Sequence, residues 1–374
     1  MISLFGFDIR LFELFCTIFS LQFLGILIII GFVVLAILVI TLRIISDRYP
    51  KIKIYSSERY YQDANSIDRH PFPNLGTTLS SKDKVFYKDL IHSSKRLSVI
   101  IPAYNEETRL PTMLNDALSY LTFRNLDYEL IVVDDGSTDL TSLVALEFSK
   151  IIDSDRIRVL TLSKNRGKGG AIRIGVLAAR GELILFADAD GATKFEDYEK
   201  LEKALEDHYN QLPNDISKSI DETFNPLAHP IAIGSRAHLE KDAIATRSFF
   251  RTILMHGFHF LVWLLTVRSV RDTQCGFKLF PRQIAHILFT HMHVERWAFD
   301  VELLVLVEHL KLPIYEVPVR WTEIEGSKLV PFFSWLQMGK DVGLIFLRYA
   351  TGSFLYPRAP FKEIFSLKSS RKSQ

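Results

Sequence analysis

The chain has 374 residues, and its 45 Lys and Arg against 43 Asp and Glu give a formal net charge of only +2, with 48% hydrophobic residues. This balance argues against a nucleic-acid binder that depends on overall basicity, and the apolar fraction is too high for a disordered chain. The two cysteines, Cys16 and Cys275, lie far apart in the sequence. A disulfide framework is therefore not expected, and a reducing compartment is the simpler assumption.

An uncharged apolar stretch covers residues 14–42, after a short N-terminal segment of residues 1–13. It is long enough to cross about 30 Å of hydrocarbon. A cleaved signal peptide has a shorter apolar core, and a buried helix of a soluble protein is rarely apolar on every face. We therefore predict one transmembrane helix. Arg10 is the only basic residue before it, whereas Arg43 and Arg48 follow it closely, so the positive-inside rule predicts that the rest of the chain is cytosolic.

Residues 43–96 have the mixed polar composition of a linker, most clearly from residue 55 onward. From residue 97, short apolar runs alternate with amphipathic stretches, as in LSVII, ELIVV, RVLTL and ELILF. This alternation predicts an α/β fold with a Rossmann-like, mostly parallel sheet flanked by helices. In such sheets ligands bind beyond the carboxyl ends of the strands. The residues that directly follow each strand are therefore the candidates for function.

Paired acids follow two of the predicted strands: Asp134 with Asp135, and Asp188 with Asp190. Asp188 and Asp190 are two residues apart in extended chain, so both carboxylates can point the same way and bind a divalent cation, Mg²⁺ or Mn²⁺. Each pair could also be a solvated turn at a strand end. Two acid pairs on one sheet edge would repel each other unless a cation or donor groups compensate, which favours ligand binding.

Two further segments suit a nucleotide. IPAYNEETRL follows the first strand, where Pro102 and Tyr104 could contact a base and Glu106 could accept hydrogen bonds. NRGKGGA places Arg166 and Lys168 among glycines at a helix start, which suits anionic oxygens. Its spacing matches neither a Walker loop nor a dinucleotide fingerprint, which disfavours a kinase or a dehydrogenase.

The segments VIIPAYNEE, IVVDDGSTD, NRGKGGA and FADADGA resemble, in this order, the catalytic core of the inverting family 2 glycosyltransferases of GT-A fold, over residues 97–240. RDTQCGFKLF and VPVRWTEIEGSKL extend the resemblance to about residue 350, and the dolichyl-phosphate β-glucosyltransferases are the most similar branch. The resemblance implies transfer of glucose from UDP-glucose to dolichyl phosphate on the cytosolic face of the endoplasmic reticulum membrane, with Mg²⁺ or Mn²⁺. The product would supply glucose for N-glycan precursor assembly.

Residue by residue, the resemblance and the motifs above predict a nucleotide-sugar site with two metal ligands, Asp188 and Asp190. The site would comprise Pro102, Ala103, Tyr104, Glu106, Asp134, Asp135, Arg166, Lys168 and Asp188. One departure concerns Ala192, because the related mannose synthases have a metal-binding Gln at that position. The resemblance also places Asp272 near the acceptor.

The acceptor half, residues 241–350, should recognise a lipid phosphate. A phosphate monoester is already largely ionised at neutral pH, so a general base is not required. It does need cations, and the candidates are Arg236, Arg247, Arg251, Arg271 and Lys278. We assign catalytic roles to Asp190, Asp272 and Arg251, with Asp272 expected to orient Arg271 rather than to act as a base.

Several segments of the C-terminal half suit a membrane surface. Residues 253–267 are mostly apolar but too short to span, which favours an interfacial helix, and a second amphipathic helix is expected from Pro331. The tail, residues 351–374, is basic and suits an anionic lipid bilayer. Residues 207–230 are predicted to form a polar insertion without an assigned role.

Three other functions fit parts of the pattern. A dolichyl-phosphate mannose synthase using GDP-mannose would share the reaction, and only RDTQCGFKLF and its neighbours favour glucose. A processive polysaccharide synthase would need several later membrane crossings and a Gln-x-x-Arg-Trp motif, where this chain has His293 in place of Gln. A non-catalytic sugar-nucleotide binder is expected to lose one of Asp188, Asp190 or Asp272, and all three are present.

Overall fold

A computed structural model describes most of the chain, in nine ranges: residues 9–62, 70–71, 78–79, 93–152, 155–213, 226–239, 257–258, 260–324 and 331–357. It divides into two compact units. One consists of Met1–Arg48 and Leu347–Leu355, and the other of Tyr49–Phe346 and Tyr356–Gln374.

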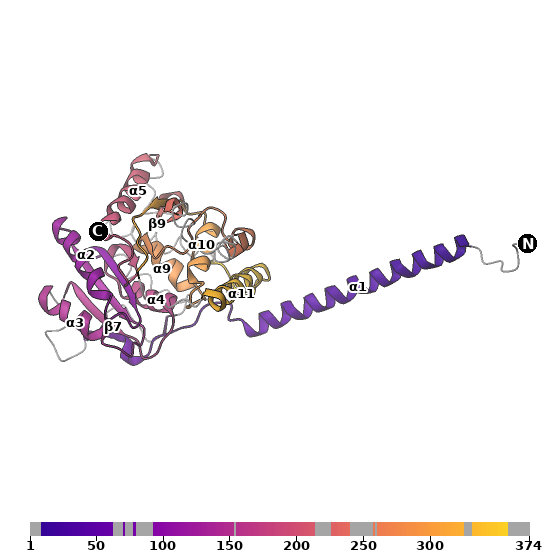
Figure 1. Cartoon of the computed structure of the whole chain (residues 1–374), viewed down its shortest axis with the longest axis horizontal. Helices are drawn as coiled ribbons and strands as arrows, with labels where there is room; N and C mark the ends of the chain where they lie inside the picture. The colour runs from indigo at the N-terminus through magenta and orange to yellow at the C-terminus, as the bar shows by residue number, and fades with distance from the viewer. Residues whose placement is uncertain are drawn as a thin grey trace, which may run out of the picture. The chain divides into compact units, whose positions relative to one another are not determined.

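The first unit contains α1 (Ile9–Ile45), which includes the helix predicted over residues 14–42 and is longer at both ends (Figure 1). Its segment Gln22–Ile45 is predominantly apolar with most side chains exposed, and it is the one helix among the described residues that is long and apolar enough to cross a membrane. Arg43 donates from Nε and Nη2 to the backbone oxygen of Thr351, at 3.0 and 2.9 Å. The last turn of α1 is thereby attached to the C-terminal part of the same unit.

The second unit is built on a seven-stranded sheet with the order β11-β9-β10-β8-β5-β6-β7. The strands are β5 (Lys95–Ala103), β6 (Tyr128–Asp134), β7 (Ile157–Thr161), β8 (Gly181–Ala187), β9 (Ile231–Ser235), β10 (Phe277–Pro281) and β11 (Ile314–Pro318). Every neighbouring pair is parallel except those made by β10, which runs antiparallel to β8 and β9. The mostly parallel sheet predicted from the sequence is confirmed.

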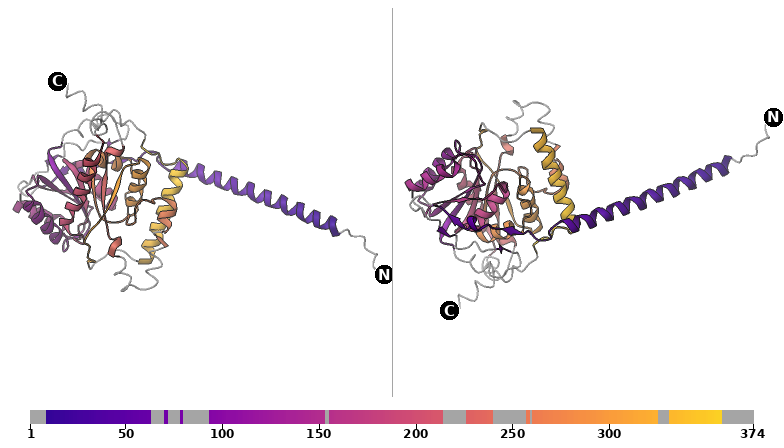
Figure 2. Two further views of the ribbon diagram at one scale, coloured as in Figure 1. Left: turned by 90° about the horizontal axis from the view of Figure 1, so that it is seen from above. Right: turned by 90° about the horizontal axis from the view of Figure 1, so that it is seen from below.

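Helices cover both faces of the sheet, as Figures 1 and 2 show. One layer contains α2 (Leu110–Phe123), α3 (Thr141–Ile152) and α5 (Tyr198–Gln211), and the other contains α4 (Lys168–Ala178), α9 (Arg282–His291) and α10 (Phe299–His309). A further helix, α11 (Pro331–Ala350), begins at the predicted Pro331. The side chains of β5 alternate between the layers: Val99 belongs to the core beneath α2, and Ile100 lies against α4. A Cβ at Gly175 of α4 would lie 2.4 Å from Ile100, so glycine permits this close packing.

The segment that precedes the sheet is more structured than the linker we expected over residues 43–96. It contains β1 (Ile52–Lys53), a 3-10 turn (Ser56–Arg59), β2 (Tyr60–Tyr61), β3 (His70–Pro71) and β4 (Thr78–Leu79). β1 pairs with β4, β2 pairs with β3, and Gln62 pairs with Val159 of β7. Its first part is therefore attached to the outer strand of the sheet.

Some predicted features lie outside the described residues. They include Arg247 and Arg251, half of the insertion over residues 207–230, and the basic tail from residue 358. Of the apolar stretch over residues 253–267, the described part is helical up to residue 265.

Candidate active site

The candidate site lies at the carboxyl ends of β5, β6, β7 and β8. Ala103, Asp134 and Thr161 are paired across the sheet and mark the level of this edge. The chain adds β6 and β7 on one side of β5 and then returns to place β8 on the other side. The strand order reverses at β5 and β8, which is where doubly wound sheets bind ligands.

The first acid pair holds the loops of this edge. Asp134 is buried; it accepts the backbone N–H of Ser137 at 2.8 Å and the hydroxyl of Ser142. Asp135 accepts the backbone N–H groups of Arg166 at 2.7 Å and of Gly167 at 2.8 Å. Burial raises the pKa of Asp135 to about 6, although these two hydrogen bonds oppose the shift. The glycine-rich loop before α4 is therefore attached to the end of β6.

Of the predicted residues here, Pro102 and Ala103 are the last two of β5, and the turn that follows positions Tyr104 and Glu106. Asn105 adopts a positive φ of 54° and receives the backbone N–H of Thr138 on its Oδ1, at 2.8 Å. Tyr104 is exposed. Glu106 is bound by the guanidinium of Arg109 at 2.6 and 2.7 Å, so its carboxylate is already engaged.

The second acid pair follows β8. Lys168, the first residue of α4, places Nζ 2.6 Å from Asp188 Oδ1. Burial lowers the pKa of Lys168, but the carboxylates of Asp188, Asp300 and Asp190 together raise it overall. Asp190 accepts the backbone N–H of Ala192 at 3.0 Å, and burial together with the charge of Asp188 raises its pKa. The loop over residues 166–168 thus contacts both acid pairs.

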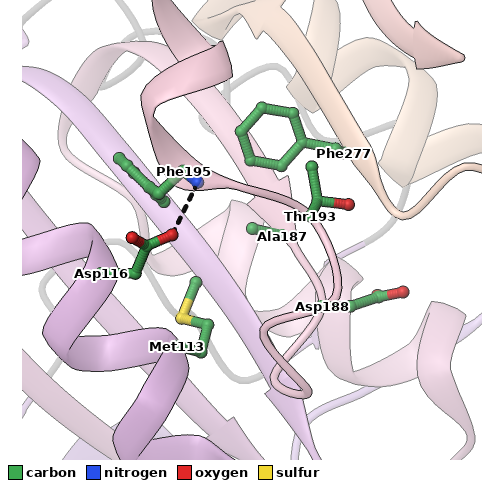
Figure 3. Close-up of a pocket in the computed structure, with 7 residues that line it drawn as sticks. All are labelled: Met113, Asp116, Ala187, Asp188, Thr193, Phe195 and Phe277. Atoms are coloured by element: carbon green, nitrogen blue, oxygen red, sulfur yellow. Dashed lines mark hydrogen bonds between the residues drawn. The ribbon is translucent and has the colours of Figure 1, made fainter. Parts of the chain in front are cut away.

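Gly276, just before β10, makes room for Asp188. A Cβ at this position would lie 2.0 Å from Asp188 Oδ2 and 2.3 Å from Cγ. The backbone N–H of Asp188 also donates to the oxygen of Gly276 at 3.1 Å. A small pocket opens beside Asp188, shown in Figure 3 and lined by Met113, Asp116, Ala187, Asp188, Thr193, Phe195 and Phe277.

The acids after β8 suit a divalent cation that also binds a substrate. Within the described residues no group of three or more His, Cys, Asp or Glu side chains could hold a metal alone. Mg²⁺ is commonly bound by one or two carboxylates together with substrate phosphates and water. Asp188 and Asp190 fit that arrangement, and Ala192 adds no oxygen ligand from its side chain.

Asp272, which is predicted to lie near the acceptor, is paired with Arg236. Asp272 accepts Arg236 Nε at 2.7 Å, Nη2 at 2.8 Å and the backbone N–H at 2.9 Å. Burial would raise the pKa of Asp272, but the guanidinium holds it below its ordinary value. The expectation that Asp272 orients Arg271 is wrong, because both carboxylate oxygens bind Arg236. Arg271 is exposed and donates its backbone N–H to Glu316.

Trp321 connects Arg236 to the loop that follows Asp190, a contact that sequence reasoning missed. The guanidinium of Arg236 lies over the indole ring, 5.3 Å from its centroid. Trp321 also forms an isolated bridge with Thr193, and the flanking Thr322 donates its backbone N–H to Ala192 at 2.9 Å. The quoted segment VPVRWTE contained this residue, but no local pattern showed what its side chain contacts.

Two predicted cations are not open to a ligand. Lys278 is fully buried on β10, where Nζ lies 2.5 Å from Asp300 and 2.6 Å from the backbone oxygen of Cys275. Its predicted contact with an acceptor phosphate does not fit this position. The Arg166 guanidinium contacts Glu58 and Glu295, so its contribution to the site comes from its backbone N–H.

Comparison with known proteins gives the relationship. Residues 98–287 match the model of glycosyl transferase family 2. The dolichyl-phosphate β-glucosyltransferase of Drosophila melanogaster is 56% identical over 82% of this chain and 87% of its own length. The Homo sapiens protein of that name is 59% identical over 70% of this chain and 78% of its own, and the Saccharomyces cerevisiae one is 43% identical over 69% and 76%.

Among solved structures, glucosyl-3-phosphoglycerate synthase from M. tuberculosis aligns over 71% of this chain and 83% of its own, at 20% identity and a TM-score of 0.43. The sequence relatives are far more similar, and each is covered over more than two thirds of its length. On this evidence the chain belongs to glycosyl transferase family 2 and, within it, to the dolichyl-phosphate β-glucosyltransferases.

Proposed function

We propose that the protein transfers glucose from UDP-glucose to dolichyl phosphate, with inversion at the anomeric carbon. One observation carries the proposal beyond family membership: the short segment from Asp272 to Gly276 contacts both halves of the site. Asp272 holds Arg236, and Gly276 leaves space for Asp188. A cationic group for an acceptor phosphate and an acid for a cation-bound diphosphate are thereby fixed next to each other.

The donor would bind along the ends of β5, β6 and β8. Tyr104 offers an exposed ring at the start of this edge, and the loop held by Asp135 follows it. A divalent cation held by Asp188 and Asp190 would supply electrostatic stabilisation of the charge that develops on the departing diphosphate. Lys168 adds a fixed positive charge beside Asp188.

The acceptor needs positioning more than activation. An oxygen of the lipid phosphate would attack the anomeric carbon while the bond from that carbon to the UDP oxygen breaks, which inverts the configuration. Asp272 remains ionised and bound to Arg236, so we assign it orientation of the guanidinium and no proton transfer. Arg271, Arg247 and Arg251 remain candidates for further phosphate contacts, the last two outside the described residues.

We also propose that α1 anchors the protein in the endoplasmic reticulum membrane, with the catalytic unit on the cytosolic face. Its apolar segment is followed by Arg43 and Arg48, in agreement with the positive-inside rule. In the catalytic unit, Phe260, Trp263 and Leu264 are exposed, and the Arg268 guanidinium lies 5.5 Å from the Trp263 ring centroid. Exposed aromatic residues beside an arginine suit a bilayer interface, where the lipid acceptor resides.

A donor competition tests the function. The purified full-length protein is incubated with dolichyl phosphate, a divalent cation and radiolabelled UDP-glucose or GDP-mannose in parallel, and the label extracted into organic solvent is counted. Label from UDP-glucose alone is expected. Label from GDP-mannose alone would retain the mechanism and replace the donor, and no label from either would refute the proposed transfer.

A further inference from the structure

The stretch between α1 and the sheet contacts the donor side of the site directly. We call residues 53–62 the edge strap. Its last residue, Gln62, exchanges two backbone hydrogen bonds with Val159 of β7, at 2.8 and 3.1 Å. The neighbouring Tyr61 lies under the guanidinium of Arg158, 5.2 Å from the ring centroid. The edge strap is therefore held against the outermost strand of the sheet, next to the loop that leaves that strand.

Glu58, in the middle of the edge strap, is fully buried and holds this loop. Its Oε1 accepts the backbone N–H of Ser163 at 3.2 Å and the Ser163 hydroxyl at 2.9 Å. Its Oε2 accepts the backbone N–H of Tyr55 at 3.1 Å and Arg166 Nη1 at 3.2 Å. A buried carboxylate is costly unless it is paired and hydrogen-bonded, and here all four contacts are donors.

Arg166 transmits this restraint to the acid at the end of β6. Its Nη1 also donates to the backbone oxygen of Lys53 at 2.7 Å, and its Nη2 lies 3.3 Å from Glu295. The side chain is thus fixed from two sides, and the backbone N–H of the same residue donates to Asp135. The next residue, Gly167, has a φ of 91°, and a Cβ there would lie 2.9 Å from the backbone oxygen of Glu295, so the loop has little room to shift.

We propose that Glu58 is a positioning residue for donor binding: through Ser163 and Arg166 it fixes the loop whose backbone N–H groups bind Asp135. The inference rests on the proposed function, because it takes the Asp135 loop to be part of the UDP-glucose site. Glutamine at position 58 would preserve the shape of the side chain. It would also remove the charge and turn one acceptor into a donor that faces other donors, so the loop should lose its fixed position.

The test uses the full-length enzyme with Glu58→Gln and, as a matched control, Glu147→Gln on the exposed face of α3, which makes the same change of charge. We expect Glu58→Gln to weaken UDP binding, measured by calorimetry, and to raise the KM for UDP-glucose, each by about tenfold. The KM for dolichyl phosphate should change less than twofold. Ser163→Ala removes one donor and serves as the milder variant if Glu58→Gln folds poorly, with an expected loss of about threefold in UDP affinity.

A purely structural Glu58 would lower the melting temperature and the active fraction while leaving both KM values unchanged. That result, or an equal rise in both KM values, would overturn the inference. The proposed function is tested separately with the unmodified enzyme. If the unmodified enzyme binds no UDP, the donor assignment is refuted, and the inference is refuted with it because it rests on that assignment. If the unmodified enzyme binds UDP, and Glu58→Gln and Ser163→Ala bind UDP with the same affinity, the inference is refuted while the proposed function stands.

Discussion

The close approach of Gly276 to Asp188 predicts that a single added methyl group will disable the proposed cation-binding site at this carboxylate. In Gly276→Ala the new Cβ would meet Asp188 Oδ2 at 2.0 Å and Cγ at 2.3 Å, whereas ordinary contacts begin at 3.4 Å. The carboxylate or β10 must therefore move by more than one ångström. Misplacement of about 1 Å in a catalytic constellation can cost about 10²-fold in rate. We expect a fall of about that size in kcat/KM for UDP-glucose and a higher cation concentration for half-maximal activity.

The assay is transfer of label from UDP-glucose to dolichyl phosphate over a series of Mn²⁺ and Mg²⁺ concentrations, with the melting temperature measured in parallel. Gly343→Ala in α11 is the matched control, because a Cβ there meets nothing within 4 Å. It adds the same methyl group in open space and should leave activity unchanged. If Gly276→Ala had the same kcat/KM and the same cation requirement as the unmodified enzyme, the reaction would not depend on Asp188, and the reasoning would be refuted.

Four further predictions follow from the geometry. Asp190→Ala should lower transfer by about 10²–10³-fold while the melting temperature and membrane attachment are retained, and retained turnover would remove the metal assignment. Asp272→Asn should weaken the hold on Arg236 and raise the KM for dolichyl phosphate by about tenfold with little change for UDP-glucose; equal changes for both substrates would argue for a general packing role. Because burial raises the pKa of Asp135 to about 6, its carboxylate gains a proton as the pH falls from 7 to 5. UDP-glucose binding measured without acceptor should weaken over that range, and Asp135→Asn should make binding nearly independent of pH. Glu129→Gln should leave the buried Arg158 without its ion pair and lower the free energy of unfolding by about 3–5 kcal/mol, seen as a melting temperature lower by roughly 10 °C; an unchanged melting temperature would contradict that.

The sequence predicts correctly that the two acid pairs lie at one edge of the sheet, because the signals for their placement are local. The strand patterns place Asp134 and Asp188 at strand ends, and parallel strands bring their carboxyl ends to one edge whatever the details of packing. A continuous uncharged apolar run predicts α1, and an amphipathic pattern predicts a helix from Pro331, where α11 begins. These features depend on a few consecutive residues, so they can be recognised without knowledge of the tertiary structure.

The features that the sequence did not predict depend on partners far away in the chain. Glu58 lies in a polar stretch with linker composition, and its importance arises from Ser163 and Arg166, more than a hundred residues later. Lys278 is a candidate phosphate ligand in the sequence because it is a cation of the acceptor half, but Asp300 compensates its charge inside the core. The partner of Asp272 is also not evident from the sequence, because Arg236 is distant in the chain and adjacent in space.

The antiparallel pairing of β10 with β8 also determines which residue of the chain lies opposite Asp188. β10 runs against β8, so the residue before its first pair, Phe277 with Ala187, lies opposite Asp188. A slip of one residue in this ladder would bring Cys275 or Phe277 to that place, and either has a Cβ where only Gly276 fits. The backbone pairing of these two buried strands therefore selects which residue faces Asp188, so the register that packs the core is also the one that leaves space for this carboxylate.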